Sequence, residues 1–219
     1  MTSTSHASTA DTSRFIHGPI YHALFDRTLT EGRKRVVDLV PEGARVVDVA
    51  SGTGELCLEL AARKRCHVMG MDLSLRMVEF ARKRNRSDPV RFVRRSAVDL
   101  SGLEPRGFDF ATILLLLHEI GREDRAAVLH EALRVARRVV VVDWQAPLPR
   151  NLHGLVIRLV EAVGGREHYG SFADYLATGG LASVLGACGV GTSVVRRSTF
   201  WHGCREIVVL DGQTKGGDR

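Results

Sequence analysis

The sequence predicts an α/β fold: a mostly parallel, twisted sheet of seven strands with helices on both faces. Short apolar segments rich in β-branched residues alternate five times with segments of helical periodicity, which is the pattern of repeated strand–helix–strand units. The run 108–117 is almost continuously apolar, as expected for a strand that is buried on both faces. The last two strand-like segments are separated by only a few residues, so they must pair as an antiparallel hairpin.

The first half of the chain supplies three of these strands and four helices. Its strand-like segments are 46–49, 66–71 and 90–93, and its helical segments are 20–29, 31–40, 56–62 and 74–83. Pro41 and Gly43 end the second helix. Ser74 is a suitable N-cap for the fourth helix, because its hydroxyl can accept a hydrogen bond from a free backbone amide.

The second half supplies four strands and four helices. Its strand-like segments are 108–117, 138–142, 190–197 and 205–210, and its helical segments are 123–135, 151–163, 171–178 and 181–187. Pro147 and Pro149 break the chain between the fifth strand and the helix 151–163. The glycine-flanked segment 164–170 is expected to be a loop.

Length and composition fit one globular domain, expected at residues 15–211. The chain has 219 residues, of which 44% are hydrophobic and 26% charged. The segments 1–14 and 212–219 are expected to be disordered tails. The longest apolar run is far shorter than the roughly 20 residues of a membrane span, and the N-terminal segment lacks the apolar block of a secretory signal. The four cysteines form no C-x-x-C pair, so we expect reduced thiols, no metal site and a cytoplasmic location.

The most informative stretch is residues 46–56, a predicted buried strand that runs through a glycine turn into a helix. Such a turn suits a nucleotide-like ligand, because glycine permits close approach and the first helical amides are free. Asp72 ends the next strand, eighteen residues after Gly54, where a carboxylate can bind ribose hydroxyls. A dinucleotide-binding turn would have a third glycine in place of Cys57. Asp48 would repel a pyrophosphate and attract an ammonium group, so a nucleoside with an amino-acid tail is favoured over a nicotinamide cofactor.

Through these residues the chain resembles the class I S-adenosylmethionine-dependent methyltransferases, whose first motif has the form D-x-G-x-G-x-G. The segment reads Asp-Val-Ala-Ser-Gly-Thr-Gly-Glu and looks most like the ubiquinone/menaquinone C-methyltransferase branch. The resemblance implies a Rossmann-like sheet with strand order 3-2-1-4-5-7-6, S-adenosylmethionine as cofactor and S-adenosylhomocysteine as product. The cofactor-binding residues that it implies are Asp48, Ala50, Ser51, Gly52, Gly54, Asp72, Leu73, Met77, Ser96, Ala97 and Leu114.

The chain departs from the family pattern at three places. Ala50 replaces the first glycine, and Ser96 stands where the family usually has an acid that binds the adenine amino group. A serine can still accept a hydrogen bond, and the amide of Ala97 can serve the adenine ring. Residues 115–119 read Leu-Leu-Leu-His-Glu, where the quinone branch typically has Phe-Gly-Leu-Arg-Asn, so a quinone is not the expected acceptor.

The acceptor side of the site offers candidates rather than a motif. The resemblance implies an N-terminal helical lid at 15–40 and a substrate-side insertion at 145–188. Candidate catalytic residues are His118, His168 and Tyr21, and candidate substrate contacts are Tyr169, Asp143 and His17. A base is needed only if the acceptor must lose a proton, as a hydroxyl does. Packing against the core or support of the cofactor turn remains an alternative role for these side chains.

The function that the sequence favours is methyl transfer from S-adenosylmethionine to a small molecule or metabolite. A net charge of +6 and the arginine-rich segment 82–95 leave RNA or a phospholipid headgroup on an anionic membrane as alternative acceptors. A protein that binds the cofactor without turnover is a third alternative, which the changes at Ala50 and Ser96 permit. The sequence does not predict the oligomeric state.

Overall fold

Seven strands form one sheet in the order β3-β2-β1-β4-β5-β7-β6, which confirms the predicted topology. The structure is a computed structural model that describes residues 19–86, 88–163, 165–188 and 193–212, with side chains left out for 19–28, 167 and 193. The first five strands pair in parallel, and β7 runs antiparallel to both of its neighbours. The strands are β1 (Arg45–Val49), β2 (His67–Asp72), β3 (Val90–Arg94), β4 (Phe108–Leu114), β5 (Ala136–Trp144), β6 (Ser193–Phe200) and β7 (Arg205–Asp211).

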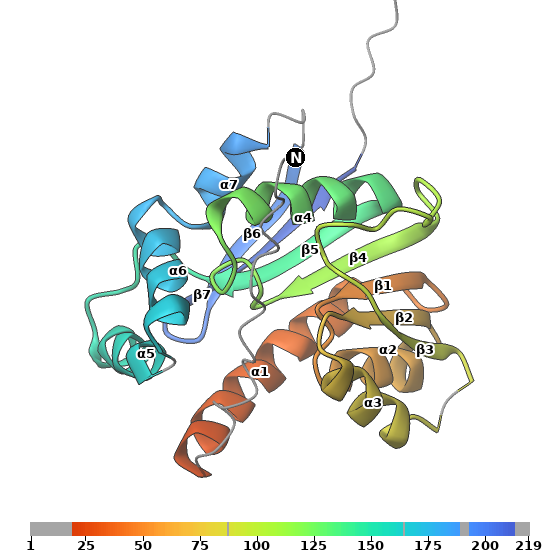
Figure 1. Ribbon diagram of the computed structural model, residues 1–219, viewed down its shortest axis with the longest axis horizontal. Helices are drawn as coiled ribbons and strands as arrows, with labels where there is room; N and C mark the ends of the chain where they lie inside the picture. Colours follow the sequence, from red (N-terminus) through yellow and green to blue (C-terminus); the bar gives the residue numbers. More distant parts are fainter. Residues whose placement is uncertain (1–18, 87, 164, 189–192, 213–219) are drawn as a thin grey trace, which may run out of the picture.

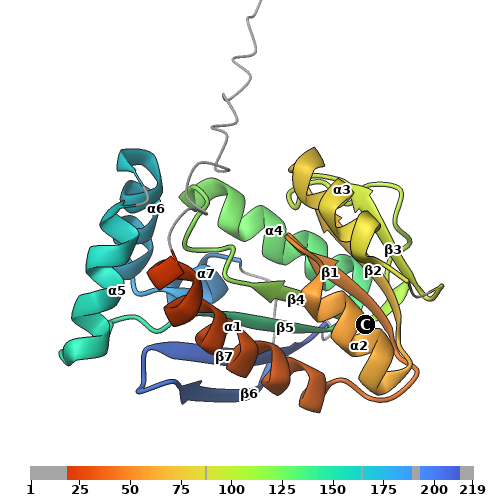
Figure 2. The same cartoon turned by 90° about the horizontal axis from the view of Figure 1, so that it is seen from below.

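Helices cover both faces of the sheet (Figures 1 and 2). Helices α1, α2 and α3 lie on one face and α4 and α7 on the other, while α5 and α6 pack together beyond the carboxyl end of β5. The helices are α1 (Pro19–Leu39), α2 (Glu55–Lys64), α3 (Leu75–Arg84), α4 (Arg122–Val135), α5 (Leu152–Val163), α6 (Arg166–Ala177) and α7 (Leu181–Ala187). Among the described residues, none of the helices has the length and apolar character needed to cross a bilayer.

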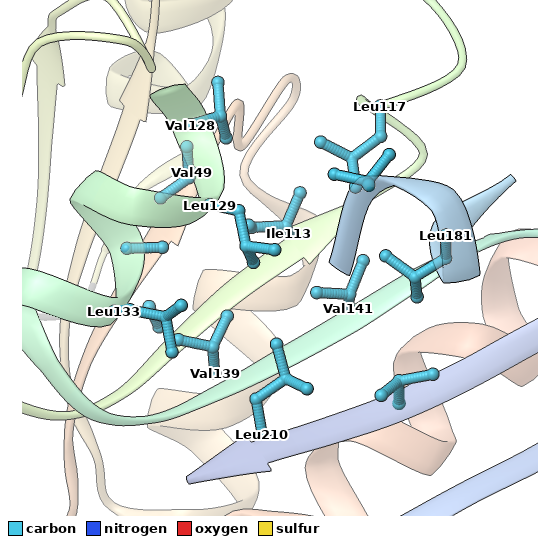
Figure 3. Packing of buried hydrophobic residues seen from close by; sticks show 14 of the residues in the cluster. Val49, Ile113, Leu117, Val128, Leu129, Leu133, Val139, Val141, Leu181 and Leu210 are labelled. Carbon is cyan, nitrogen blue, oxygen red and sulfur yellow. The ribbon is translucent and has the colours of Figure 1, made fainter. Parts of the chain in front are cut away.

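Alternation along the strands divides the apolar core into two layers. In β1, Val47 and Val49 belong to the layer beneath α4, whereas Val46 belongs to the layer beneath α1 and α2, because successive side chains of a strand point to opposite faces. Figure 3 shows the α4 layer, where Leu129 and Leu133 pack over strand residues that include Val139. This packing fixes the central strands, and the functional residues lie at their carboxyl ends.

Four sequence predictions about the elements differ from the structure. The helices expected at 20–29 and 31–40 form the single helix α1, since the intervening residues include neither glycine nor proline. The strand expected to reach residue 117 ends at Leu114, because Leu115 takes a left-handed backbone conformation with φ of 56°. The loop expected at 164–170 contains the start of α6, and β6 extends to Phe200 rather than residue 197. The expected tails lie outside the described residues, apart from Gly212.

Arg125 joins the segment after β4 to α6. Its side chain is 2% exposed, and its guanidinium donates to the carbonyls of Leu117 (2.8 Å) and Ser171 (2.7 Å) and to the carboxylate of Asp174 (2.8 Å). Arg122 also pairs with Asp174, at 2.6 Å, but its side chain is 67% exposed. The two arginines therefore share a partner and differ mainly in burial.

Removal of the buried arginine should destabilise the protein far more than removal of the exposed one. We expect Arg125→Ala to lower the free energy of unfolding by about 3 kcal/mol, because it leaves buried carbonyls and part of a charge pair without a donor. Arg122→Ala should change it little, since solvent screens an exposed pair. Urea unfolding followed by circular dichroism measures both variants, and equal losses would contradict the assignment.

Candidate active site

The turn between β1 and α2 depends on residues with left-handed backbone conformation. Ala50, Gly52 and Gly54 have φ of 59°, 53° and 79°. A Cβ on Gly54 would lie 2.5 Å from the ring of Phe92, whereas no described heavy atom lies within 4 Å of the place for a Cβ on Gly52. Gly54 is thus required by packing beneath the turn, and Gly52 leaves open space above it.

Asp72 lies against this turn, as the sequence predicts. Its Oδ2 accepts a hydrogen bond from the amide of Gly52 (2.9 Å), and its Oδ1 accepts one from the amide of Ser74 (2.8 Å). The parallel pairing of β1 and β2 aligns Val49 with Met71, so the residue after Met71 comes beside the turn. The carboxylate and the glycine amide are therefore brought together by strand register.

Asp48 faces inward rather than toward the turn surface. It is 3% exposed, and it accepts hydrogen bonds from the hydroxyl of Thr112 (2.6 Å) on β4 and the thiol of Cys57 (3.3 Å) on α2. Burial raises the pKa of Asp48 to about 6, although both of these hydrogen bonds act to lower it. Cys57, which stands in place of the third glycine, therefore has a role as a partner of Asp48 that the sequence pattern does not reveal.

The residues expected around an adenine and a ribose border the same edge of the sheet. The pairing of β2 with β3 aligns Asp72 with Arg94, and the amide of Arg95 donates to the Asp72 carbonyl at 3.0 Å. The chain segments that continue from these two strands therefore leave the sheet side by side. The side chain of Leu73 is 48% exposed, and the four other candidates along this rim are half-buried: Met77, Ser96, Ala97 and Leu114.

On the acceptor side, Asp143 orients His118. His118 follows β4, is 3% exposed, and its Nδ1 lies 2.6 Å from Oδ1 of the fully buried Asp143. Asp143 also accepts hydrogen bonds from the amides of Leu117 (2.9 Å) and Trp144 (2.7 Å). Since a carboxylate only accepts, Nδ1 of His118 carries the proton. Burial lowers the pKa of His118, but the charge and hydrogen bond of Asp143 outweigh it and raise the pKa to about 9.

His168 joins His118 through a residue that the sequence did not single out. Glu161 on α5 is 5% exposed, and its Oε2 lies 2.5 Å from Nε2 of His168, which belongs to the first turn of α6. Its Oε1 accepts a hydrogen bond from the indole of Trp144 (3.1 Å) and lies 3.9 Å from Nε2 of His118. The hydrogen bond to Glu161 raises the pKa of His168. The available sequence signal for Glu161 is that it is the single acidic residue of a mainly apolar helix.

The other acceptor-side candidates do not join this cluster in the described part of the structure. Tyr169 is 38% exposed, and its ring centroid lies 6.2 Å from that of Phe172. His17 lies outside the described residues, and Tyr21 falls in the part of α1 whose side chains are not described. Two of the expected catalytic residues, His118 and His168, and one expected substrate contact, Asp143, thus come together beyond the carboxyl ends of β4 and β5.

Comparison with known proteins identifies the domain. Residues 46–138 match a family model described as a methyltransferase domain. Over 147 residues the chain is 33% identical to the demethylmenaquinone methyltransferase of Thermus thermophilus. Over the same length it is 26% identical to a ubiquinone/menaquinone biosynthesis C-methyltransferase of Geotalea uraniireducens. Residues 46–138 thus form a methyltransferase domain, and the chain is similar to class I S-adenosylmethionine-dependent methyltransferases. The alignments cover 62% of this chain and 66% and 62% of these relatives, so they span slightly less than two thirds of each protein.

Solved structures share the fold of this methyltransferase domain. The magnesium protoporphyrin IX methyltransferase of Synechocystis, with bound S-adenosylhomocysteine, superimposes with a TM-score of 0.62 at 20% identity, covering 94% of this chain and 89% of that one. A SAM-dependent methyltransferase of Aquifex aeolicus gives a TM-score of 0.61 at 18% identity, covering 92% and 98%. The family match includes the turn, Asp72 and His118, whereas Asp143, Glu161 and His168 lie beyond it.

The two glycines of the turn should respond differently to substitution. Gly52→Ala imposes only the left-handed strain on a side chain, about 1 kcal/mol. Gly54→Ala adds a clash with Phe92 and should cost about 3 kcal/mol or more in the free energy of unfolding. Chemical denaturation of both variants checks this difference, and a smaller loss for Gly54→Ala than for Gly52→Ala would contradict the packing role.

The buried carboxylate of Asp48 should make stability depend on pH. Its folded pKa of about 6 lies above the ordinary value of 3.8, so the folded state holds the proton more tightly than the unfolded state. Stability should therefore fall as the pH rises through this range, by up to about 3 kcal/mol relative to Asp48→Asn. Urea unfolding of both proteins from about pH 4 to about pH 7 measures the difference. A difference between Asp48→Asn and the wild type that stays flat over this pH range would refute the assignment.

Proposed function

We propose that this protein transfers a methyl group from S-adenosylmethionine to a small-molecule acceptor. The observation that most strongly supports this proposal is the 2.9 Å hydrogen bond between the Asp72 carboxylate and the Gly52 amide. It joins the ends of β1 and β2, which are expected to hold the nucleoside. The paired acidic residue and glycine turn suit the ribose and the amino-acid tail of this cofactor. The fold match to a methyltransferase with bound S-adenosylhomocysteine supports the same ligand.

The reaction is an in-line displacement at the sulfonium methyl group. The bond between sulfur and the methyl carbon breaks, its electron pair stays on sulfur, and the acceptor atom supplies the pair for the new bond. The sulfonium charge already activates the methyl group, so the protein mainly positions the acceptor. β4 lies beside β1 in the sheet, so the segment with His118 borders the cofactor turn.

His118 lies among aromatic rings that are themselves buried, with Trp144 and Phe172 each 1% exposed and Tyr175 0% exposed. The ring centroids of Trp144, Phe172 and Tyr175 lie 6.0, 6.1 and 6.4 Å from that of His118. Aromatic side chains with a few polar groups are typical of small-molecule sites. The similar proteins include a demethylmenaquinone methyltransferase and a magnesium protoporphyrin IX methyltransferase, whose names give small-molecule substrates.

The contacts of the basic segment 82–95 favour a small molecule over a polyanion. Arg82 donates to the carbonyl of Phe92 through two nitrogens, and Arg94 donates to the carbonyl of Leu73. These guanidinium groups hold α3 and β3 to each other and to the β2–α3 connection.

The cytoplasmic location is part of the same proposal. It is supported by four buried cysteines that are all free thiols.

Calorimetric titration with S-adenosylhomocysteine tests the cofactor assignment. The folded wild-type protein should bind it with one site per chain. Asp72→Ala should weaken the affinity by about 10- to 100-fold, because it removes charge-assisted hydrogen bonds to the ribose. Asp38→Ala, which removes an exposed carboxylate of α1, is the matched control and should bind like the wild type. Folded wild-type protein that shows no heat of binding would overturn the proposal.

A screen of radiolabelled methyl transfer to small aromatic acceptors, to RNA and to anionic vesicles then identifies the acceptor class. Labelled product from a small molecule supports the proposal. Transfer confined to RNA or lipid would replace the small molecule as the proposed acceptor. Cofactor binding without any methylated product would favour a protein that binds the cofactor without turnover.

A further inference from the structure

The buried cluster of His118, Glu161 and His168 has a composition that methyl transfer itself does not explain. The cluster joins three separate elements: the segment after β4, α5 and α6. Its ligand atoms all lie within 4.8 Å of one another. We propose that these three residues bind one divalent zinc-like metal ion and leave one coordination position open.

The donor set and the distances fit such an ion. Two histidines and one glutamate, with a fourth position left open, are a recognised ligand set of catalytic zinc. Bond lengths near 2.0–2.1 Å place tetrahedral ligand atoms about 3.3 Å apart. The observed separations from the Glu161 carboxylate are 2.5 Å to His168 and 3.9 Å to His118. Small side-chain movements in opposite directions would therefore equalise these distances around an ion.

The hydrogen bonds that neighbouring residues make to these ligands are also arranged as in a metal site. Nδ1 of His118 donates to Asp143 (2.6 Å), so Nε2 is the nitrogen that faces the cluster, and it would bind a metal on losing its proton. Oε1 of Glu161 accepts a hydrogen bond from the indole of Trp144 (3.1 Å). Asp143 and Trp144 are consecutive residues at the end of β5, a strand paired on both sides. Outer partners of this kind orient metal ligands and set their basicity.

Charge balance supports the same assignment. Asp143 is fully buried and Glu161 is 5% exposed, so two carboxylates lie out of contact with bulk water. Buried charges in proteins are paired or coordinate metals. Binding of a dication would displace a proton from each imidazole, and the ion would then compensate both carboxylates in place of those protons. His168, whose side chain is 20% exposed, gives the cluster an opening to solvent.

A metal here would prepare the acceptor, and this role rests on the proposed function whereas metal binding itself does not. An acceptor oxygen or sulfur atom in the open position would lose its proton to solvent at neutral pH, because the ion lowers its pKa. The resulting anion would attack the methyl carbon as sulfur leaves with its electron pair. The metal would thus replace the single general base that a hydroxyl acceptor otherwise needs.

Cobalt binding tests the site without cofactor or acceptor. Untagged, chelator-treated protein is titrated with Co²⁺, and tetrahedral coordination is followed by visible absorption; Zn²⁺ then competes. We expect one ion per chain, displaced by Zn²⁺. His168→Gln and Glu161→Gln should each weaken binding by more than about 100-fold, since loss of a ligand exceeds loss of an outer partner.

His153→Gln is the matched control, because His153 and His202 stack with ring centroids 3.8 Å apart outside the cluster. This variant should retain the wild-type affinity within about threefold. Absence of a cobalt spectrum in wild-type protein, or a spectrum that survives His168→Gln, would overturn the proposal; so would loss with His153→Gln alone. Circular dichroism verifies folding, and His168→Gln decides the matter if the more buried Glu161→Gln does not fold. If the wild-type protein binds S-adenosylhomocysteine but not Co²⁺, this inference fails while the proposed function stands.

Discussion

The site depends on a carboxylate at the end of a parallel strand that closes the neighbouring turn. Each oxygen of Asp72 accepts one backbone hydrogen bond, from Gly52 and from Ser74. Both donors are main-chain groups, so the cofactor turn and the start of α3 hold their positions through the fold itself. A carboxylate offers about four acceptor sites, so Asp72 retains capacity for ribose hydroxyls. The contact that organises the turn is thus compatible with the ligand that the turn is expected to bind.

Asp143 has the corresponding role three strands along the sheet. It ends β5 much as Asp72 ends β2, and it accepts the amides of Leu117 and Trp144 as well as Nδ1 of His118. The left-handed turn after β4 brings His118 back over the sheet edge, where this carboxylate lies. Both halves of the site therefore use the same device: a strand-end acid that fastens an adjacent segment through backbone amides.

The parts of the structure that the sequence predicts are those set by local pattern. Strands β1 and β2, the glycine turn between them and Asp72 all lie within or next to residues 46–72. Because these strands are adjacent and parallel, they bring the turn and Asp72 together with little dependence on distant residues. The glycine-flanked sequence predicts a loop at Gly165, yet this residue immediately precedes α6. The contacts of Glu161 were not predictable, because they require α5, α6 and β5 to pack in three dimensions. Its neighbours in sequence indicate only an apolar helix.

There is a chemical reason why the cofactor side is predictable from sequence and the acceptor side is not. Every methyltransferase of this class binds the same sulfonium nucleoside, and its leaving group is activated before the protein acts. The cofactor side therefore has the same role in each protein and can be recognised from a sequence motif. The acceptor differs from protein to protein, and the acceptor side proposed here consists of residues 118, 143, 161 and 168, most of them beyond the matched family segment. A lone histidine would suffice to remove a proton from a hydroxyl. The clustering of two histidines around a buried glutamate is more than that step requires, which is why the acceptor chemistry of this chain has to be derived from its own packing rather than from its relatives.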